Sequence, residues 1–322
     1  MIADAIPTKL LHSSDKRGLH SAISSLNKRS LSPTLFSSFL SASFRLDRFE
    51  MKFVITGEQR AALMPDIMPK LKADENAIEG AYYPIVSLYY DTADRACYWE
   101  KEQKYPSRRK MRVRVYGSLN GKLPPTCFIE VKHKCDGRGV KRRVRLPLED
   151  CLRVSAGERV DGKFSIPDQR SIEEICKLVH ERGFKPTMVM RYDRMAYADR
   201  NPESDLRVTF DTGIGYRMDN LIPVPDDRRF TQYMLPEGYS VMEVKVTGSV
   251  PYWLTKTVGE HHCVLQSHSK YSNALEDGDD VLHEMMGGRP VKHFYGITPH
   301  SLGTAATTDA TRGTEGPIAA AS

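Results

Sequence analysis

Polar and apolar residues alternate along several short stretches of the chain, as they do in β-strands that have one buried face. Between residues 48 and 55, Glu50 and Lys52 fall on one face of such a strand, whereas Phe53 and Ile55 fall on the other. The same pattern, more or less cleanly, marks the segments 84–91, 110–116, 127–134, 139–146, 187–197, 205–211 and 240–247. We therefore expect about eight strands, joined mostly by the short connections of an antiparallel sheet.

Helical patterns are fewer and lie between these strands. A capping box at 56–59 begins a segment that runs to about residue 72 and contains two prolines, so we expect a kink or two short helices. A second capping box at 171–174, followed by Gly183 as a natural stop, predicts another helix. Residues 251–263 are a third candidate. Together these elements predict the α+β class.

Composition divides the chain into three parts. Residues 1–43 contain eleven serines and no clear periodicity, so we expect a disordered head, with an organellar transit peptide or a misplaced gene start as alternatives. Residues 44–276 form the predicted folded domain, and residues 277–322 a disordered tail. No apolar run approaches the ~18–20 residues of a membrane-spanning helix. Six cysteines without a CxxC pair indicate reduced thiols, so we expect a cytoplasmic location.

Positive charge is concentrated in one region of the predicted sheet. Residues 101–145 hold fifteen Lys or Arg and three Asp or Glu, although the net charge of the whole chain is only +6. The charged strand faces either meet solvent in a sandwich or line the interior of a closed barrel, and periodicity alone leaves both open. A barrel lined by so many like charges would be very costly without a bound polyanion, so the charged faces are either solvated or built to bind phosphates. Nucleic acid is not expected, because few aromatic residues accompany the cations.

Eight short segments, taken in order, resemble the catalytic domain of the vacuolar transporter chaperone (VTC) polyphosphate polymerases. They span about residues 48–275 and are 48–52, 110–114, 128–132, 140–143, 192–194, 206–212, 242–245 and 269–271. The resemblance implies the fold of the triphosphate tunnel metalloenzymes, a closed eight-stranded antiparallel β-barrel with helices packed outside. It also implies a metal-dependent polymerase that transfers the γ-phosphate of ATP to a growing polyphosphate chain inside a basic tunnel.

The resemblance assigns roles to matching positions of this sequence. The residues with an implied catalytic role are Lys52, Arg112, Arg114, Lys132 and Lys270. Those with an implied role in binding ATP and polyphosphate are Lys141, Arg143, Tyr192, Arg194, Arg207 and Lys245. Glu243 is implied as the ligand of Mn²⁺ or Mg²⁺, and Glu50 and Glu130 are further candidates. Arginine suits phosphate because its planar fork binds two oxygens, and hard divalent cations prefer carboxylate oxygen.

One departure from the wider superfamily bears on the reaction. Hydrolytic relatives carry a Glu-x-Glu-x-Lys signature on the first strand, and Arg48 stands at the first of these positions. A carboxylate is therefore replaced by a cation, which favours the polymerase over a triphosphatase. Two alternatives stay open: a tunnel triphosphatase that hydrolyses inorganic or organic triphosphate, and a protein that binds polyanions without catalysis.

Overall fold

The computed structural model describes residues 48–74, 82–117, 126–136, 138–225 and 227–288. The predicted head and the end of the predicted tail lie outside these residues. Contacts divide the chain between Arg48 and Phe49, and the side chains discussed below all belong to the part that begins at Phe49. Within the described residues no helix is both long and apolar enough to cross a membrane.

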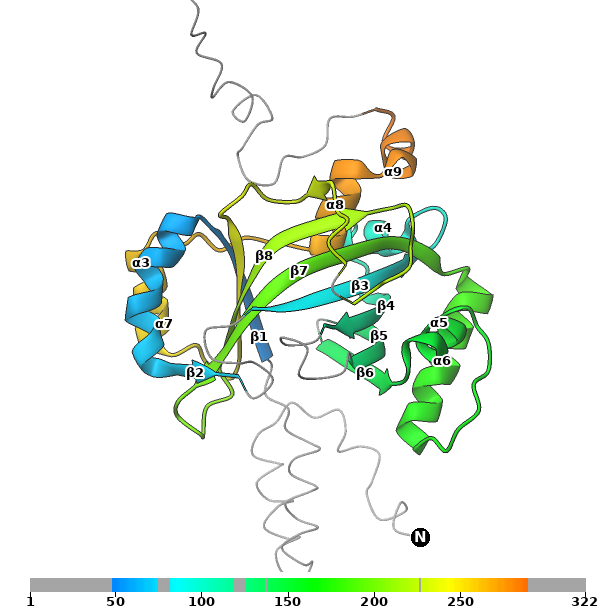
Figure 1. Ribbon diagram of the computed structural model, residues 1–322, viewed down its shortest axis with the longest axis horizontal. Helices are drawn as coiled ribbons and strands as arrows, with labels where there is room; N and C mark the ends of the chain where they lie inside the picture. The colour runs from blue at the N-terminus through cyan, green and yellow to red at the C-terminus, as the bar shows by residue number, and fades with distance from the viewer. Residues whose placement is uncertain (1–47, 75–81, 118–125, 137, 226, 289–322) are drawn as a thin grey trace, which may run out of the picture. The chain divides into compact units, whose positions relative to one another are not determined.

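A single antiparallel sheet contains all the predicted strands (Figure 1). The hydrogen-bonded order of its main path is β1-β10-β8-β7-β3-β4-β5-β6, and two short strands, β2 and β9, pair with β7 and β8. The bounds are β1 Arg48–Ile55, β2 Leu71–Ala73, β3 Tyr83–Asp91, β4 Ser107–Tyr116, β5 Thr126–Cys135, β6 Arg138–Arg145, β7 Lys185–Asp199, β8 Arg207–Arg217, β9 Gln232–Tyr233 and β10 Ser240–Thr247. The sheet curls strongly (Figure 1), and its charged face is the concave one, because Glu50 on β1 pairs across the sheet with Lys132 on β5.

The sheet is open, so the prediction of a closed barrel is wrong. Its two outer strands, β1 and β6, are not hydrogen-bonded neighbours. The edge of β1 that faces away from β10 is occupied instead by the segment after α7. Phe53 forms an antiparallel bridge with Leu265, and the backbone N–H of Gln266 donates to the carbonyl of Lys52 at 2.9 Å. This local pairing occupies backbone groups of β1 that closure would have required.

Helices cover the outer face of the sheet at two places. α3 (Gly57–Ile67) packs against α7 (Tyr252–Glu260) over the end of the sheet that holds β1, while α5 (Leu148–Ser155) and α6 (Ile166–Arg182) cover β5 and β6 (Figure 1). α4 (Ala96–Glu102) lies against β4. Two more helices, α8 (Lys270–Gly278) and α9 (Asp280–Met285), follow; α9 falls within the range expected to be a tail.

The helix ends show which capping predictions hold. The capping box of Thr56 and Gln59 is present, and the chain continues after α3 as a short 3₁₀ turn, η3 (Met68–Lys70). α6, however, begins after Ser165, whose side chain accepts from the backbone N–H of Asp168. Ser171 lies inside that helix and donates its hydroxyl to the carbonyl of Pro167 instead. The predicted start at Ser171 is therefore wrong by about one and a half turns.

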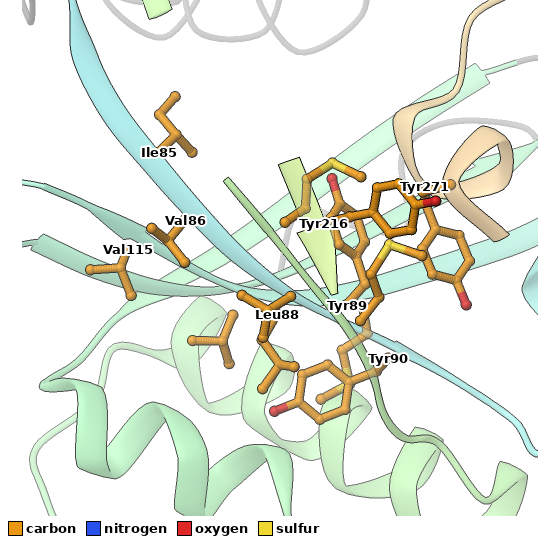
Figure 2. Packing of buried hydrophobic residues seen from close by; sticks show 14 of the residues in the cluster. Ile85, Val86, Leu88, Tyr89, Tyr90, Val115, Tyr216 and Tyr271 are labelled. Atoms are coloured by element: carbon orange, nitrogen blue, oxygen red, sulfur yellow. The ribbon is translucent and has the colours of Figure 1, made fainter. Parts of the chain in front are cut away.

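Apolar residues from alternate positions of β3 to β6 form the main core beneath α5 and α6. Figure 2 shows Leu88 and Tyr90 pointing towards these helices, and the hydroxyl of Tyr90 lies 2.6 Å from that of Ser155 on α5. The other face of β3 turns inward. There Tyr89 stacks on Tyr271 of α8, with ring centroids 5.2 Å apart. This stack places the start of α8 against the concave face.

Candidate functional site

Register places the charged side chains of neighbouring strands on one face. Directly opposed residues of an antiparallel pair point to the same side of the sheet. Arg112 on β4 is opposite Glu130 on β5, and Arg194 on β7 is opposite Asp211 on β8. The charged residues that share these positions therefore converge on the concave face, where α8 adds Lys270.

Glu243 on β10 lies at the centre of one group of cations. Its Oε1 is 3.0 Å from Lys270 Nζ, and its Oε2 is 2.9 Å from Lys245 Nζ. Lys52 Nζ lies 3.9 Å from Oε1, and Arg194 Nη2 lies 3.7 Å from Oε2. Burial raises the pKa of Glu243, but the charges of Lys270, Lys245, Lys52 and Arg194 outweigh it and hold that pKa well below its usual value. The carboxylate is therefore ionised.

Asp211 is a second buried carboxylate of this group. Its two oxygens each lie 2.6 Å from a nitrogen of Arg194, and Oδ2 lies 2.7 Å from Lys270 Nζ. Sequence reasoning placed Asp211 on the charged face of its strand but gave it no role. Alternation could indicate that Asp211 lies on the charged face. Its pairing with Arg194 depends on the register between β7 and β8, which the sequence does not give.

Glu50 connects the two ends of the curled sheet. Its Oε1 lies 3.1 Å from Lys52 Nζ and 3.9 Å from Lys245 Nζ, and its Oε2 lies 3.5 Å from Lys132 Nζ. Because β1 and β5 are far apart in the strand order, the pair with Lys132 spans the open side of the sheet. Burial raises the pKa of Glu50, but Lys52, Lys245 and Lys132 lower it to about 2.

Glu130 on β5 organises a second group of cations. Nε and Nη2 of Arg112 each lie 2.7 Å from its Oε2, and Lys141 Nζ lies 2.5 Å from its Oε1. Arg112 also donates to the hydroxyl of Tyr89 at 3.4 Å. Burial raises the pKa of Glu130, but Arg112, Arg114 and Lys141 lower it below its usual value. Arg112 and Lys141 are thus held in place by an ionised acid.

Arg114 and Tyr192 lie between the two groups. Arg114 donates to Ser87 Oγ at 3.2 Å and to the hydroxyl of Tyr192 at 3.1 Å. The ring centroid of Tyr192 lies 5.1 Å from Lys270 Nζ and 5.3 Å from Arg194 Cζ. Burial raises the pKa of Tyr192. Among the described residues Arg114 has no carboxylate at ion-pair distance, so its positive charge is available to an anion.

Two of the predicted substrate-binding residues lie outside both groups. Arg207 Nε pairs with Asp74 Oδ2 at 2.9 Å, near the short strand β2. Arg143 is exposed, and its Cζ lies 4.6 Å from the ring centroid of Phe128. Conversely, Ser87 and Tyr89 contact the site arginines although the sequence gave them no role. The strand that carries them has no basic residue, and its inward positions before Asp91 are uncharged, so its pattern gave little indication of a site.

Cations outnumber acids in these two groups. Seven of the eight cations contact at least one of four carboxylates, and Arg114 lies between the groups without such a contact among the described residues. The formal excess is therefore four positive charges. The cations are Lys52, Lys132, Lys141, Lys245, Lys270, Arg112, Arg114 and Arg194, and the carboxylates are Glu50, Glu130, Asp211 and Glu243. Such an excess on a concave surface attracts and concentrates multiply charged anions.

The carboxylates fit a divalent metal only in part. No group of three His, Cys, Asp or Glu among the described residues is placed to hold a metal alone. Glu50 and Glu243, however, share Lys52 and Lys245 as neighbours, so their oxygens lie in one small region. Mg²⁺ commonly binds through one or two carboxylates, with substrate phosphates and water completing its shell. Glu50 and Glu243 fit that mode, whereas Glu130 contacts a different set of cations.

Comparisons with known proteins place the chain in a family. No curated protein matches it. Among solved structures, the Mimivirus capping enzyme triphosphatase is similar over 72% of this chain and 97% of that chain, with 12% sequence identity and a TM-score of 0.31. The VTC domain family matches residues 47–277, which include both groups of cations. The chain therefore belongs to the VTC domain family, a family of the triphosphate tunnel metalloenzyme-like fold.

Proposed function

We propose that this protein is a metal-dependent polyphosphate polymerase. In the proposed reaction, an oxygen of the terminal phosphate of a polyphosphate chain attacks the γ-phosphorus of ATP. The bond from that phosphorus to the β–γ bridging oxygen breaks, the chain grows by one phosphate, and ADP leaves. The observation that carries the proposal is the convergence of eight cations on one concave face with only four carboxylates.

The arrangement supplies what phosphoryl transfer needs from a protein. Such reactions depend mainly on alignment of the phosphates and neutralisation of their charge. Arg194 is fixed by Asp211, and Arg112 is fixed by Glu130, so these guanidinium groups are oriented before a substrate arrives. Arg114, which has no carboxylate partner in the described region, provides the planar donor set that matches phosphate oxygens.

The weak basicity of the carboxylates and of His268 at the site favours transfer to phosphate over hydrolysis. A general base works best when its pKa lies near the working pH. The pKa values of Glu243, Glu50 and Glu130 are all lowered, with that of Glu50 near 2. Burial and the charges of Lys270 and Lys52 also lower the pKa of His268 to about 3. These groups are poor acceptors for a proton of water, whereas a terminal phosphate is anionic and needs no base.

Mn²⁺ or Mg²⁺ would be held by Glu243 and Glu50 together with the phosphates of the substrate. When bound, such a metal neutralises charge that develops on the transferring phosphoryl group. The cationic side chains of the concave face would position the phosphates. Lys270 and Lys245, which contact Glu243 in the structure, would then be available to bind phosphate oxygens.

The full chain, ATP and MnCl₂ suffice for the decisive experiment. Products are resolved on a gel that stains polyphosphate, and free phosphate is assayed in parallel. We expect a polyphosphate ladder with wild type, no ladder with Glu243→Ala, and a normal ladder with Glu174→Gln. Glu174 is a matched control because it pairs with Arg109 and Arg142 on the outer face. Free phosphate without a ladder would support the triphosphatase. The absence of both products would contradict catalysis.

A further inference from the structure

Three lysines stand in one row across the sheet. Lys110 on β4 is opposite Lys132 on β5, and Lys132 is opposite Lys141 on β6. Alternation puts all three on the concave face together with Arg112 and Arg114. Like charges directly opposite one another destabilise a sheet. The row is therefore an unfavourable arrangement for the empty site and a favourable one for an anion.

Carboxylates compensate only two members of the row. Lys132 pairs with Glu50 at 3.5 Å, and Lys141 pairs with Glu130 at 2.5 Å. Lys110 has no carboxylate at ion-pair distance in the part of the chain that the structure describes. Its Nζ lies 3.5 Å from Ser269 Oγ, at the limit of a hydrogen bond, and 5.4 Å from the ring centroid of Tyr271.

The surroundings of Lys110 leave its charge poorly compensated. Groups from three packed elements surround its ammonium group: Cys97 and Lys101 from α4, Tyr89 and Asp91 from β3, and Tyr271 from α8. Lys132 lies opposite Lys110 on β5, on the same face of the sheet. Asp91, the acid among them, already accepts from the hydroxyl of Tyr271 and from two backbone N–H groups. Burial lowers the pKa of Lys110 to about 8. A lysine in such a place gains most from a ligand that brings negative charge.

We propose that Lys110, Lys132 and the hydroxyl of Ser269 form a subsite for one phosphate group of the bound polyanion, at the end of the concave face where α8 begins. The subsite rests on the proposed function, since it would bind one phosphate of the same polyphosphate chain. Ser269 is the N-cap of α8, so the partial positive charge of the helix N-terminus adds to the two lysines. Lys110 then contributes binding energy that depends on its charge.

A purely structural role for Lys110 predicts a different outcome. Its contacts with Ser269 and Tyr271 could simply anchor α8 against β4. In that case its removal lowers the thermal stability of the empty protein and perturbs ligand binding regardless of pH. In the proposed role, Lys110→Met leaves the melting temperature of the empty protein unchanged or raised, because one of three opposed charges is removed.

Calorimetric titration of the full chain with inorganic triphosphate, without metal, tests the subsite. Near pH 7 we expect Lys110→Met to weaken binding roughly tenfold, as for loss of a hydrogen bond between charged groups. Lys110→Arg should bind within about threefold of wild type because it keeps the charge. Lys177→Met, which removes an exposed lysine from α6 on the outer face, should bind like wild type.

A second titration near pH 9.5 separates charge from shape. Lys110 loses its proton as the pH rises through about 8, whereas arginine stays charged. The ratio of triphosphate affinity between wild type and Lys110→Met should therefore be smaller at pH 9.5 than at pH 7. The ratio between Lys110→Arg and Lys110→Met should stay the same. Comparison of variants at one pH cancels the titration of triphosphate itself. Equal binding by wild type and Lys110→Met near pH 7 would overturn the subsite alone, whereas a wild type that binds no triphosphate would overturn the proposed function as well.

Discussion

Glu243 has four cationic neighbours, and this crowding decides what its loss does. When the charge of Glu243 is removed, Lys270 and Lys245 each lose an ion pair, and the positive excess on the concave face increases. We expect Glu243→Gln to bind inorganic triphosphate more tightly than wild type in the absence of metal, yet to lose turnover of ATP roughly 100-fold with Mn²⁺. Calorimetry and the gel assay measure the two effects. Weaker metal-free binding would contradict a neutralising role for Glu243.

Glu50 gives the stability of the fold a defined dependence on pH. Its pKa is lowered from a usual 4.5 to about 2, so its ionised form stabilises the native state. That contribution is complete above about pH 4.5 and is lost as the pH falls through about 2. Thermal unfolding should show a gap between wild type and Glu50→Gln that is largest near pH 6 and narrows towards pH 2. Glu58→Gln, on the exposed side of α3, is the control and should show no such trend.

At the residue scale, alternation predicted the shared face but not the partners. Arg112 and Glu130 were both expected on the charged faces of their strands, and the register confirms that they point to the same side. The acids that pair with Arg194 and Arg207 are distant from them in sequence and are brought near only by the fold. Asp211 lies opposite Arg194 only in the observed register, and Asp74 reaches Arg207 from beyond β2. Local pattern contains no information on such pairs.

At the element scale, α8 is held to the sheet by acids near its C-terminus. The hydroxyl of Tyr98 on α4 donates to buried Glu276 at 2.9 Å, and the hydroxyl of Tyr216 on β8 donates to Asp277. Arg95 forms a bidentate pair with Asp279 just after the helix. These contacts fix the helix whose first residues are Ser269, its N-cap, and Lys270.

Tyr98→Phe tests how far these contacts stabilise the protein. The substitution removes one hydrogen bond to a buried carboxylate and leaves the ring in place, so we expect the free energy of unfolding to fall by about 1–2 kcal/mol. Urea denaturation measures the change. Tyr105→Phe is the matched control, because the side chain of Tyr105 is exposed and its loss of a hydroxyl should have little effect. Equal stability of both variants would show that the hydrogen bond from Tyr98 to Glu276 does not stabilise the protein.

Elements with a strong local pattern were the ones that sequence predicted well. The eight long strands follow alternation, and α3 follows its capping box. The start of α6 was placed too late because Ser165 competes with Ser171 as a cap, and Pro167 in the first turn favours the earlier start. The short strands β2 and β9 have no periodicity of their own, and they exist because longer strands present free edges to them.

At the scale of the whole molecule, closure of the sheet could not be read from the chain. Alternation fixes which face of a strand is buried, but it does not say whether the first and last strands of a sheet meet. Here the segment at Leu265 and Gln266 takes the edge of β1, while Glu50 reaches Lys132 through side chains. An ion pair across the opening therefore connects β1 with β5, which are not hydrogen-bonded neighbours in the described sheet.

The positive excess of the concave face predicts opposite responses of the empty and loaded protein to salt. Without a ligand, repulsion among the cations lowers stability, and salt screens that repulsion. The melting temperature of the empty protein should therefore rise as NaCl increases from about 50 mM to about 500 mM. Triphosphate stabilises the native state by binding to it, and the same salt weakens this binding. The stabilisation by a fixed triphosphate concentration should therefore shrink over that range.

Differential scanning fluorimetry at several NaCl concentrations, with and without triphosphate, distinguishes repulsion from ion pairing. Four carboxylates hold seven of the eight cations by contacts such as Arg194 with Asp211 and Lys141 with Glu130, and salt also weakens these attractions. If they dominated, the melting temperature of the empty protein would fall with salt. A rise means that the unpaired charge dominates, so that part of the stability of this fold is supplied only when a polyanion occupies the concave face.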